Sequence, residues 1–382
     1  MQPSSTFTLG IEEEFQMVEQ TTGRLIPCIH SILPKAGPNL SKHLKAEVQQ
    51  STIELVSDVL PDIAAARVHV RDLRIQLAQL LADEGLALIS AGTHPSALWQ
   101  EQLVTENERY SVFEEEFQQA SRSTLTYGLH VHVGVANPEL IIPLMNQVRS
   151  WLPHLLALSS NSPFWGGGLT GIKSYRALVL LRIFRSGIPE VFPTRASFEQ
   201  YVQCLVEAGH IDNGRKIWWD IRPHPIYPTL EFRVCDMPAT FDDTLALAAL
   251  CQALIAKLTW LHQRNLSTHV LPRYFVEEHK WHATRYGLDG QVADFVQGRH
   301  LSMRDSISEL LDLVDDVLDD LGSRREIDHL RRLLVNPQGT GADRQIEIYQ
   351  RTGSIQAVTQ YLIDQTAESL DTGTPKIPTQ SS

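Results

Sequence analysis

The sequence predicts an α+β fold with an antiparallel sheet, on the strength of three observations. Strand-like segments occupy the first two-thirds of the 382 residues, whereas the last third, from Met303 to about Leu370, has a helical pattern. Strands and helices do not alternate regularly, which disfavours a doubly wound parallel sheet. Two strand-like segments, at 217–222 and 229–234, flank the proline-rich turn HPIYP, as is typical of neighbouring antiparallel strands.

The other elements follow from hydrophobic periodicity and from residues that begin or end helices. Pro61 and Asp62 suit the first turn of a helix, and Gly85 suits its end. Taken in order, the sequence predicts a strand at 7–18, a helix at 61–84, a strand at 86–91, a helix at 107–122, a strand at 125–135, and helices at 138–159, 175–184, 197–208 and 242–263.

The composition and charge narrow the class of protein. The chain is 43% hydrophobic and 20% charged, which is ordinary for a soluble globular protein. Its 33 basic and 45 acidic residues give a net charge of −12. A nucleic-acid-binding protein normally carries a basic stripe, but no Lys/Arg run here exceeds two residues. The sequence therefore argues against a nucleic-acid partner.

The chain has no proline- or serine-rich linker, so we expect one domain at 1–370 and a disordered tail at 371–382. The apolar segment 245–261 is shorter than the ~20 residues of a membrane span and contains Lys257, which favours a buried helix and no membrane partner. The N-terminal residues lack the apolar region of a signal peptide, and the four cysteines form no C-x-x-C pair. These features predict a cytoplasmic protein with free thiols.

Ionisable residues fall on one face of the first predicted strand. Because side chains alternate along a strand, Glu12 and Glu14 share one face, while Ile11 and Phe15 share the other with Glu13. An exposed edge strand with solvated glutamates is the plain alternative.

Two later strands repeat this alternation. His130 and His132 share one face of their strand, and Glu231 shares a face with Arg233. A single buried histidine is usually structural, and a lone Glu–Arg pair contributes little at a surface. Three strands with the same pattern instead predict a sheet that has one apolar face and one ionisable face lining a cavity.

Glu47 and Glu54 add two carboxylates seven positions apart. This spacing changes parity along a strand, so the two share a face only if the segment is helical or a bulge or turn intervenes. If these glutamates converge with those of the strands, their ionised forms repel and favour bound cations. Mg²⁺, with carboxylate and phosphate ligands, is the usual solution, and arginines such as Arg233 would face the phosphate oxygens.

A glycine-rich segment at 166–171 precedes Lys173 and Arg176. It does not match the P-loop pattern, because Ile172 separates Gly171 from the lysine and no strand leads into it. A flexible loop that carries two cations near a site is the simpler interpretation.

Six motifs occur in order between about residue 7 and about residue 365. The longest is WWDIRPHPIYPTLEFRVCD at 218–236, which is specific, whereas GIEEEF at 10–15 alone would not be. The others are GLHVHVG at 128–134, NSPFWGG at 161–167, TGIKSYR at 170–176 and RYGLDG at 285–290. Together they resemble the carboxylate–amine ligases of the glutamate–cysteine ligase type 2 family.

The resemblance implies a glutamine synthetase-like catalytic domain, with a curved antiparallel sheet, helices packed outside and an open active-site funnel. It also implies ATP-dependent chemistry, in which a phosphorylated carboxylate is attacked by an amine. The residues that match the family's metal positions are Glu12, Glu14, Glu47, Glu54, His130 and Glu231. Arg233 and Arg176 are the expected catalytic residues, and Lys173, Arg185, Arg222 and His132 are expected to contact substrate or phosphate.

The leading hypothesis is therefore a Mg²⁺- and ATP-dependent ligase with weak glutamate–cysteine ligase activity. Its partners would be a small amino acid and an amine, and the chain would form a homo-oligomer if apolar residues of the C-terminal helices, such as Ile307 and Leu310, lie at an interface. One alternative is a zinc hydrolase that uses His130, His132 and a carboxylate. The other is a non-catalytic homologue that binds a metabolite.

Overall fold

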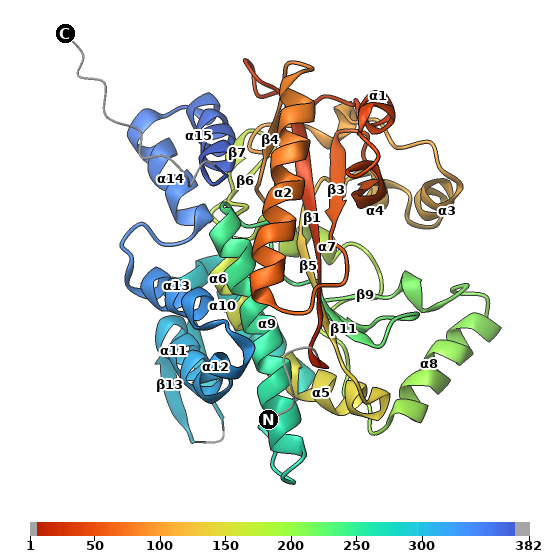
Figure 1. The fold of residues 1–382 in the computed structure, drawn as a ribbon, viewed down its shortest axis with the longest axis vertical. Coiled ribbons are helices and arrows are strands. Elements are labelled where there is room, and N and C mark those ends of the chain that lie inside the picture. The colour runs from red at the N-terminus through yellow and green to blue at the C-terminus, as the bar shows by residue number, and fades with distance from the viewer. Residues whose placement is uncertain (1–5, 296, 371–382) are drawn as a thin grey trace.

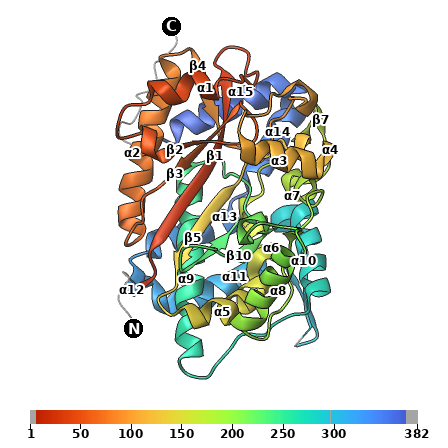
Figure 2. The same ribbon diagram turned by 90° about the vertical axis from the view of Figure 1, so that its right-hand side faces the viewer.

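The computed structural model describes residues 6–295 and 297–370, and the predicted tail at 371–382 lies outside these residues. Figures 1 and 2 show one large sheet with long helices packed against it and a helical C-terminal part beside them. The division into one domain at 1–370 stays a prediction. The helical character predicted for the last third is confirmed by α11 (Met303–Leu313), α13 (Arg324–Val335), α14 (Gly341–Thr352) and α15 (Ile355–Glu368).

Within the described residues, seven strands form one sheet in the order β10-β11-β5-β1-β3-β2, with β4 also paired to β1. Every pairing in this sheet is antiparallel, so the predicted sheet type is confirmed. The strands are β1 (Leu9–Glu19), β2 (Leu44–Ala46), β3 (Thr52–Val56), β4 (Leu86–Ile89), β5 (Leu129–Gly134), β10 (Ile221–Pro223) and β11 (Thr229–Phe232).

Three helices cover the apolar face of the sheet: α2 (Ile63–Ala82), α5 (Ile141–Val148) and α9 (Phe241–His262). Helix α2 begins where predicted, because the Asp62 carboxylate accepts a hydrogen bond from the amide of Ala65. Helix α9 is long and apolar enough to cross a membrane, but 89% of its most apolar 18-residue stretch is buried inside the protein. It is the central core helix that its sequence predicted.

Glu13 is the one ionisable side chain that β1 directs into this core. Its carboxylate is fully buried and accepts hydrogen bonds from Nε (2.7 Å) and Nη2 of Arg74, which projects from α2. Arg74 is equally buried, and its Nη2 also donates to Thr244 Oγ1 of α9 at 3.0 Å. The pair therefore links the sheet to both helices that cover it.

Several elements differ from the sequence prediction. The helix expected at 138–159 is divided into α5 and α6 (Leu152–Ser159) by a 3₁₀ turn, since Pro153 cannot donate an amide to the preceding turn. The helix expected at 107–122 breaks at Gln118, where φ is +51°. Helix α10 (Arg273–Tyr286) and the hairpin of β12 (Gln291–Asp294) and β13 (Arg299–Ser302) were not predicted.

The apolar residues of α11 that suggested a subunit interface are fully buried within this chain. Ile307 and Leu310 are both inaccessible to solvent and belong to the main hydrophobic core. These two residues therefore stabilise the fold of the chain itself.

His94 is a buried neutral imidazole, and it makes the stability of the fold depend on pH. Its Nδ1 accepts hydrogen bonds from the amides of Ser96 (3.2 Å) and Ala97 (3.0 Å), so the proton lies on Nε2, which donates to Gly23 O (2.8 Å). Burial lowers the pKa of His94 from 6.5 to about 4. Because the unfolded chain binds this proton more tightly, the stabilisation is present above pH 6.5 and is lost as the pH falls toward 4.

We expect proton binding to His94 in the unfolded chain to lower the free energy of unfolding by about 2 kcal/mol as the pH falls from 7 to 5. Urea denaturation at the two pH values, in the native chain and in His94→Gln, measures it. The variant should be less stable at pH 7 but should lose about 2 kcal/mol less than the native chain over this interval. Equal losses in the two proteins would contradict the assignment.

Candidate active site

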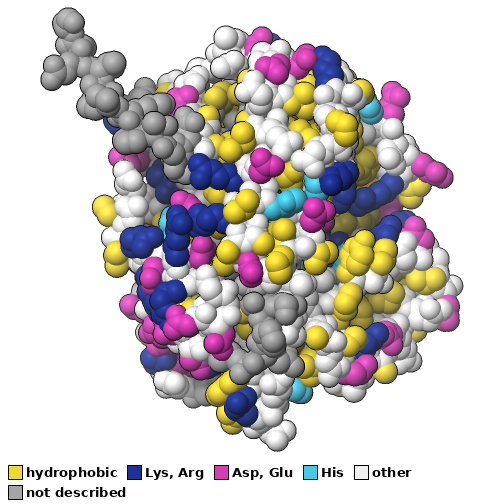
Figure 3. Space-filling view, in the orientation of Figure 1, with side chains coloured by type: hydrophobic (Ala, Val, Ile, Leu, Met, Phe, Trp, Pro, Cys, Tyr) yellow, Lys and Arg dark blue, Asp and Glu magenta, His cyan; other side chains and the backbone are white. Residues whose placement is uncertain are grey.

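A cavity of about 690 Å³ lies on the face of the sheet opposite α2 and α9. Its walls come from β1, β3, β5, helix α3 (Glu108–Phe117), helix α7 (Tyr175–Leu180) and the loop that leads into β9 (Trp218–Trp219). Figure 3 shows a hollow at the right of the view, with Lys and Arg side chains at its border and hydrophobic side chains below it. The cavity is therefore built on the polar face of the sheet.

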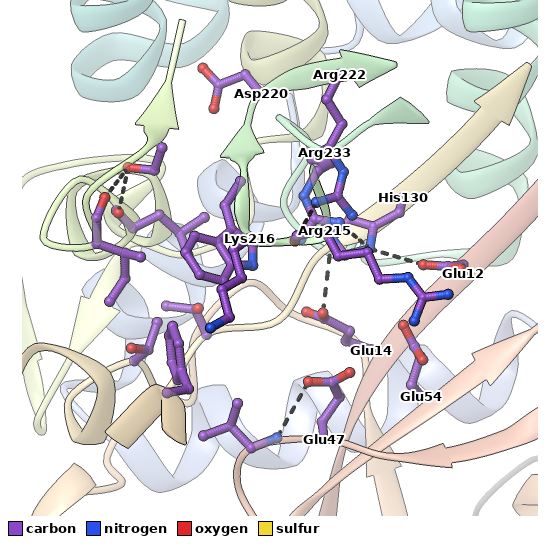
Figure 4. Close-up of a pocket in the computed structure, with 18 of the residues that line it drawn as sticks. Glu12, Glu14, Glu47, Glu54, His130, Arg215, Lys216, Asp220, Arg222 and Arg233 are labelled. Atoms are coloured by element: carbon purple, nitrogen blue, oxygen red, sulfur yellow. Dashed lines mark hydrogen bonds and ion pairs between the residues drawn. The ribbon is translucent and has the colours of Figure 1, made fainter. Parts of the chain in front are cut away.

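The register of the sheet brings the carboxylates of β1 beside polar residues of its two neighbours. Glu12 pairs with His130 of β5, and Glu14 pairs with Glu54 of β3. All four line the cavity, whereas Ile11 and Phe15 are buried in the core on the opposite face (Figure 4). The alternation expected from the sequence is present in the structure.

Glu47 joins this group from the turn that connects β2 to β3. Its Oε2 accepts a hydrogen bond from the amide of Val48 at 3.3 Å, which holds the carboxylate at the cavity wall. Because a turn separates Glu47 from Glu54, the two carboxylates can face the same cavity despite their spacing of seven positions. Carboxylate oxygens of Glu14, Glu47 and Glu54 lie within 4.8 Å of one another.

Burial and mutual repulsion raise the pKa values of three carboxylates in this cluster. Burial, followed by the charge of Glu47, raises the pKa of Glu14 to about 7. Burial also raises the pKa of Glu47 and, together with the charges of Glu47 and Glu12, raises that of Glu54. The nearest lysine, Lys45, lies 3.6 Å from Glu54 Oε2 and is half exposed. Oxygen ligands that repel one another in this way fit a hard divalent cation.

Two imidazoles complete the cluster. His130 Nδ1 lies 3.3 Å from Glu12 Oε2, and His132 Nε2 lies 3.5 Å from Glu12 Oε1. Burial, and then the charge of Arg233, lowers the pKa of His130 to about 4. Burial alone would raise the pKa of Glu12. Contacts with both histidines lower this pKa by more than burial raises it, so the carboxylate is ionised. His132 Nε2 is buried and has no hydrogen-bond partner among the described residues, as expected of an atom that awaits a ligand.

Glu231 is held by two arginines and does not line the cavity. Arg222 donates to it from Nε (2.7 Å) and Nη2 (3.1 Å), and Arg233 donates from Nη1. Burial would raise the pKa of Glu231, but the two guanidinium groups outweigh it and keep the carboxylate ionised. The cavity therefore meets Arg222 and Arg233 directly, with Glu231 fixing their orientation from behind.

Arg176 lines the cavity, but its guanidinium is committed to the protein. It donates to the carbonyls of Val234 (3.3 Å) and Arg233 (3.1 Å) and lies 3.9 Å from a carboxylate oxygen of Asp236. Gly128 lets Arg176 approach the backbone closely, since a Cβ at this position would collide with the guanidinium.

Lys173 and Arg185 do not reach the cavity. Lys173 forms ion pairs with Asp289 (2.7 Å) and Asp343 (2.6 Å), which tie the glycine-rich loop to the C-terminal helices. Arg185 forms an ion pair with Glu116 at 2.6 Å and packs against the ring of Trp218. Both side chains are therefore paired with carboxylates of the protein itself and are not available to a ligand in the cavity.

Five basic residues at the cavity were not predicted as site residues: Lys45 on β2, Arg109 on α3, Arg215 and Lys216 on the loop before β9, and Lys280 on α10. In Figure 4 Arg215 extends from its loop over the carboxylates. The position of this loop immediately before the motif WWDIRPHP was the only sequence signal for it. Beside these cations, Phe113 packs on Trp218 with ring centroids 5.4 Å apart and forms an aromatic wall.

The cavity thus joins an anionic floor to a cationic rim and an aromatic wall. Such an arrangement can hold divalent cations among the carboxylates and a polyanionic ligand between those cations and the arginines. The aromatic wall offers a flat apolar surface to a ring or an aliphatic group.

Comparisons with known proteins agree with this chemistry. A profile described as glutamate-cysteine ligase family 2 matches residues 8–361. The chain is 44% identical over 366 residues to "Putative glutamate--cysteine ligase 2" of Solibacter usitatus strain Ellin6076, covering 96% of this chain and 94% of that protein. It is 42% identical over 368 residues to the protein of the same name from Herpetosiphon aurantiacus, covering 96% and 95%.

Two solved structures share the fold. The glutamate–cysteine ligase of Francisella tularensis in complex with AMP superposes with a TM-score of 0.72 at 12% identity and covers 98% of this chain and 90% of that one. The bifunctional glutathione synthetase of Pasteurella multocida gives a TM-score of 0.71 at 14% identity, over 96% of this chain and 53% of that one. The predicted α+β, glutamine synthetase-like fold is confirmed.

Proposed function

Because the chain belongs to glutamate–cysteine ligase family 2, as its motifs predicted, we propose that it is an ATP-dependent carboxylate–amine ligase. The proposed substrates are an amino acid that supplies the carboxylate, glutamate first among them, and an amine such as that of cysteine. The products would be an amide, ADP and phosphate. A cytoplasmic location and a homo-oligomer stay predictions.

The carboxylate cluster is the observation that carries this proposal. Glu14, Glu47 and Glu54 bring three oxygen ligands together, and Glu12 adds a fourth beside His130 and His132. This donor set fits Mg²⁺, which prefers carboxylates and the phosphates of a bound nucleotide. When bound, Mg²⁺ would neutralise the phosphate charge and polarise the transferred phosphoryl group.

The residues of the cavity would catalyse the reaction mainly by positioning and electrostatics. In the proposed reaction, an oxygen of the substrate carboxylate attacks the γ-phosphorus of ATP, and the bond to ADP breaks. The amine nitrogen then attacks the carbonyl carbon of the acyl phosphate, loses a proton and expels phosphate. Arg222 and Arg233, oriented by Glu231, would pair with phosphate oxygens as charge develops there.

The same geometry weighs against a zinc hydrolase. Zinc sites are mostly built from imidazole and thiolate with few carboxylates, whereas this cluster combines four glutamates, Glu12, Glu14, Glu47 and Glu54, with two histidines, His130 and His132. A cation-rich rim of Arg109, Arg215 and Lys216 would also have no role in a simple hydrolytic zinc centre.

A phosphate-release screen tests the proposal directly. Each amino acid would be paired with amine acceptors in the presence of ATP and Mg²⁺, and the amide product would be identified by mass spectrometry. We expect one pair to release phosphate only when ATP, Mg²⁺, amino acid and amine are all present. Stable ATP binding without turnover of any pair would instead support a non-catalytic metabolite-binding protein, and one tight zinc per chain in the cavity would support a hydrolase.

A further inference from the structure

Two histidines and an aspartate meet at the edge of the sheet, outside the cavity. His43 ends the 3₁₀ turn Ser41–His43 that leads into β2, Asp58 follows β3, and His69 lies on α2. One nitrogen of each ring and one oxygen of Asp58 lie within 4.8 Å of one another. We propose that these three residues form a binding site for Zn²⁺ or a similar transition-metal ion, separate from the cavity.

The tautomer of His43 leaves a lone pair aimed into this group. The ring is buried, with 4% of its surface exposed, and Nδ1 lies 2.9 Å from the carbonyl oxygen of Val56. A carbonyl oxygen can only accept, so Nδ1 carries the proton and Nε2 carries the lone pair. Nε2 faces Asp58 Oδ2 at 4.0 Å. A ring whose Nδ1–H is held by a backbone carbonyl, with Nε2 left to bind, is the arrangement found in metal-binding histidines.

His69 presents the same kind of atom from the other side. The amide of Asp58 donates a hydrogen bond to Nε2 at 3.2 Å, so this nitrogen carries the lone pair, and a bound metal ion would displace the amide from it. Nε2 lies 3.8 Å from Asp58 Oδ2, and the two imidazole rings meet edge to face with centroids 5.2 Å apart. Burial lowers the pKa of His69, which keeps the ring neutral.

Three acceptor atoms therefore converge, and the proton directed at one of them is that of the Asp58 amide. The separations of 3.8 and 4.0 Å exceed the length of a hydrogen bond, so the carboxylate of Asp58 shares no proton with either ring. With metal bonds of about 2.0–2.1 Å, the ligand atoms of a tetrahedral zinc site lie about 3.3 Å apart. The two nitrogen–oxygen separations need to contract by less than about 1 Å, and Asp58, which is 62% exposed, is free to move that far.

The donor set decides the class of ion. Two imidazole nitrogens and one carboxylate oxygen suit Zn²⁺ and its transition-metal neighbours, whereas Mg²⁺ and Ca²⁺ prefer oxygen ligands alone. The moderate exposure of His69 and the larger exposure of Asp58 leave room for water to complete the coordination. The site would be exchangeable rather than closed.

The location separates this site from the cavity. In the pairing of β2 with β3, Leu44 is opposite Leu55 and Lys45 is opposite Glu54, so His43 lies at the end of the pair away from Glu47. β2 is the edge strand of the sheet. A metal ion here would connect the edge strand to α2 and would stabilise a part of the sheet that lacks a further neighbour.

Isothermal titration with Zn²⁺ alone tests the site in the full chain. The background variant Glu14→Gln weakens metal binding in the cavity, so that the remaining site can be measured. In this background we expect one bound Zn²⁺ and a thermal midpoint that rises with Zn²⁺ concentration. Asp58→Asn and His69→Gln should each weaken the binding by about 100-fold or more, since each removes a ligand. Circular dichroism would confirm that both exposed variants fold.

His262→Gln is the matched control, because His262 is an exposed histidine at the end of α9, outside the group. It should bind Zn²⁺ as the background protein does. The proposal would be overturned if the background protein bound no Zn²⁺, if Asp58→Asn and His69→Gln bound it unchanged, or if His262→Gln lost as much affinity as they do. None of these outcomes depends on whether the cavity has ligase activity.

Discussion

Glu14→Gln is expected to reduce ATP turnover by at least about 100-fold while leaving the fold intact. Glu14 lies at the centre of the cluster: it pairs with Glu54 across β1 and β3, and its oxygens lie within reach of those of Glu47. Glutamine has the same shape and keeps an oxygen that can accept the hydrogen bond from the Gly128 amide. It removes the negative charge that a divalent cation requires, so the loss would appear in catalysis rather than in stability.

The measurement is ATP turnover at saturating Mg²⁺, together with the free energy of unfolding. Glu116→Gln is the matched control, because Glu116 also lines the cavity but lies on α3 and pairs with Arg185. It makes the same chemical change outside the cluster, and we expect it to retain most of the activity. Full activity of Glu14→Gln would refute the assignment of this residue to a metal site.

Arg74→Met is expected to have the largest effect on stability, lowering the free energy of unfolding by about 3–5 kcal/mol. Arg74 and Glu13 are both buried in the core and bond to each other. Removing the arginine leaves a carboxylate with neither water nor a counter-charge, and Thr244 loses the hydrogen bond from Nη2. Unfolding in urea, followed by circular dichroism, measures the change.

A second variant shows whether the cost comes from the unpaired charge. Glu13→Leu combined with Arg74→Met replaces both partners by apolar side chains, and we expect it to recover most of the lost stability. Arg71→Met, on the same helix, removes an arginine that is only half-buried and bonds to the carbonyl of Leu370. It should cost no more than about 1 kcal/mol. A double variant as unstable as Arg74→Met alone would argue for a packing defect instead.

The sequence was sufficient to predict three of the strands that carry the site, but not β3, which carries Glu54. Alternation on β1, β5 and β11 placed Glu12, Glu14, His130 and Arg233 correctly on one face, because a sheet with one buried face allows only one register. The long helices α2 and α9 were predictable for a similar reason: their apolar residues and N-terminal caps act locally.

The rest of the site could not be predicted, because it depends on contacts between residues that are far apart in the sequence. Nothing near Lys173 in the sequence shows that Asp289 and Asp343 would pair with it, and Arg185 likewise pairs with a glutamate 69 positions away. The alternation along β11 gave the face of Glu231 but could not show that Arg222, from the adjacent strand, would occupy its oxygens. The short strand β2 was missed because three residues carry too little periodicity to recognise.

The register of the sheet limits how this protein can evolve. It pairs Glu12 with His130, Glu14 with Glu54, and Glu231 with His132. Each of these six residues is fixed by a cross-strand partner, and each strand is fixed by the apolar residues on its other face. Insertion or deletion of a single residue within β1 would turn its glutamates inward and its core residues outward at once. Descendants of this chain can therefore vary the loop at the rim that carries Arg215 far more freely than they can lengthen or shorten these strands.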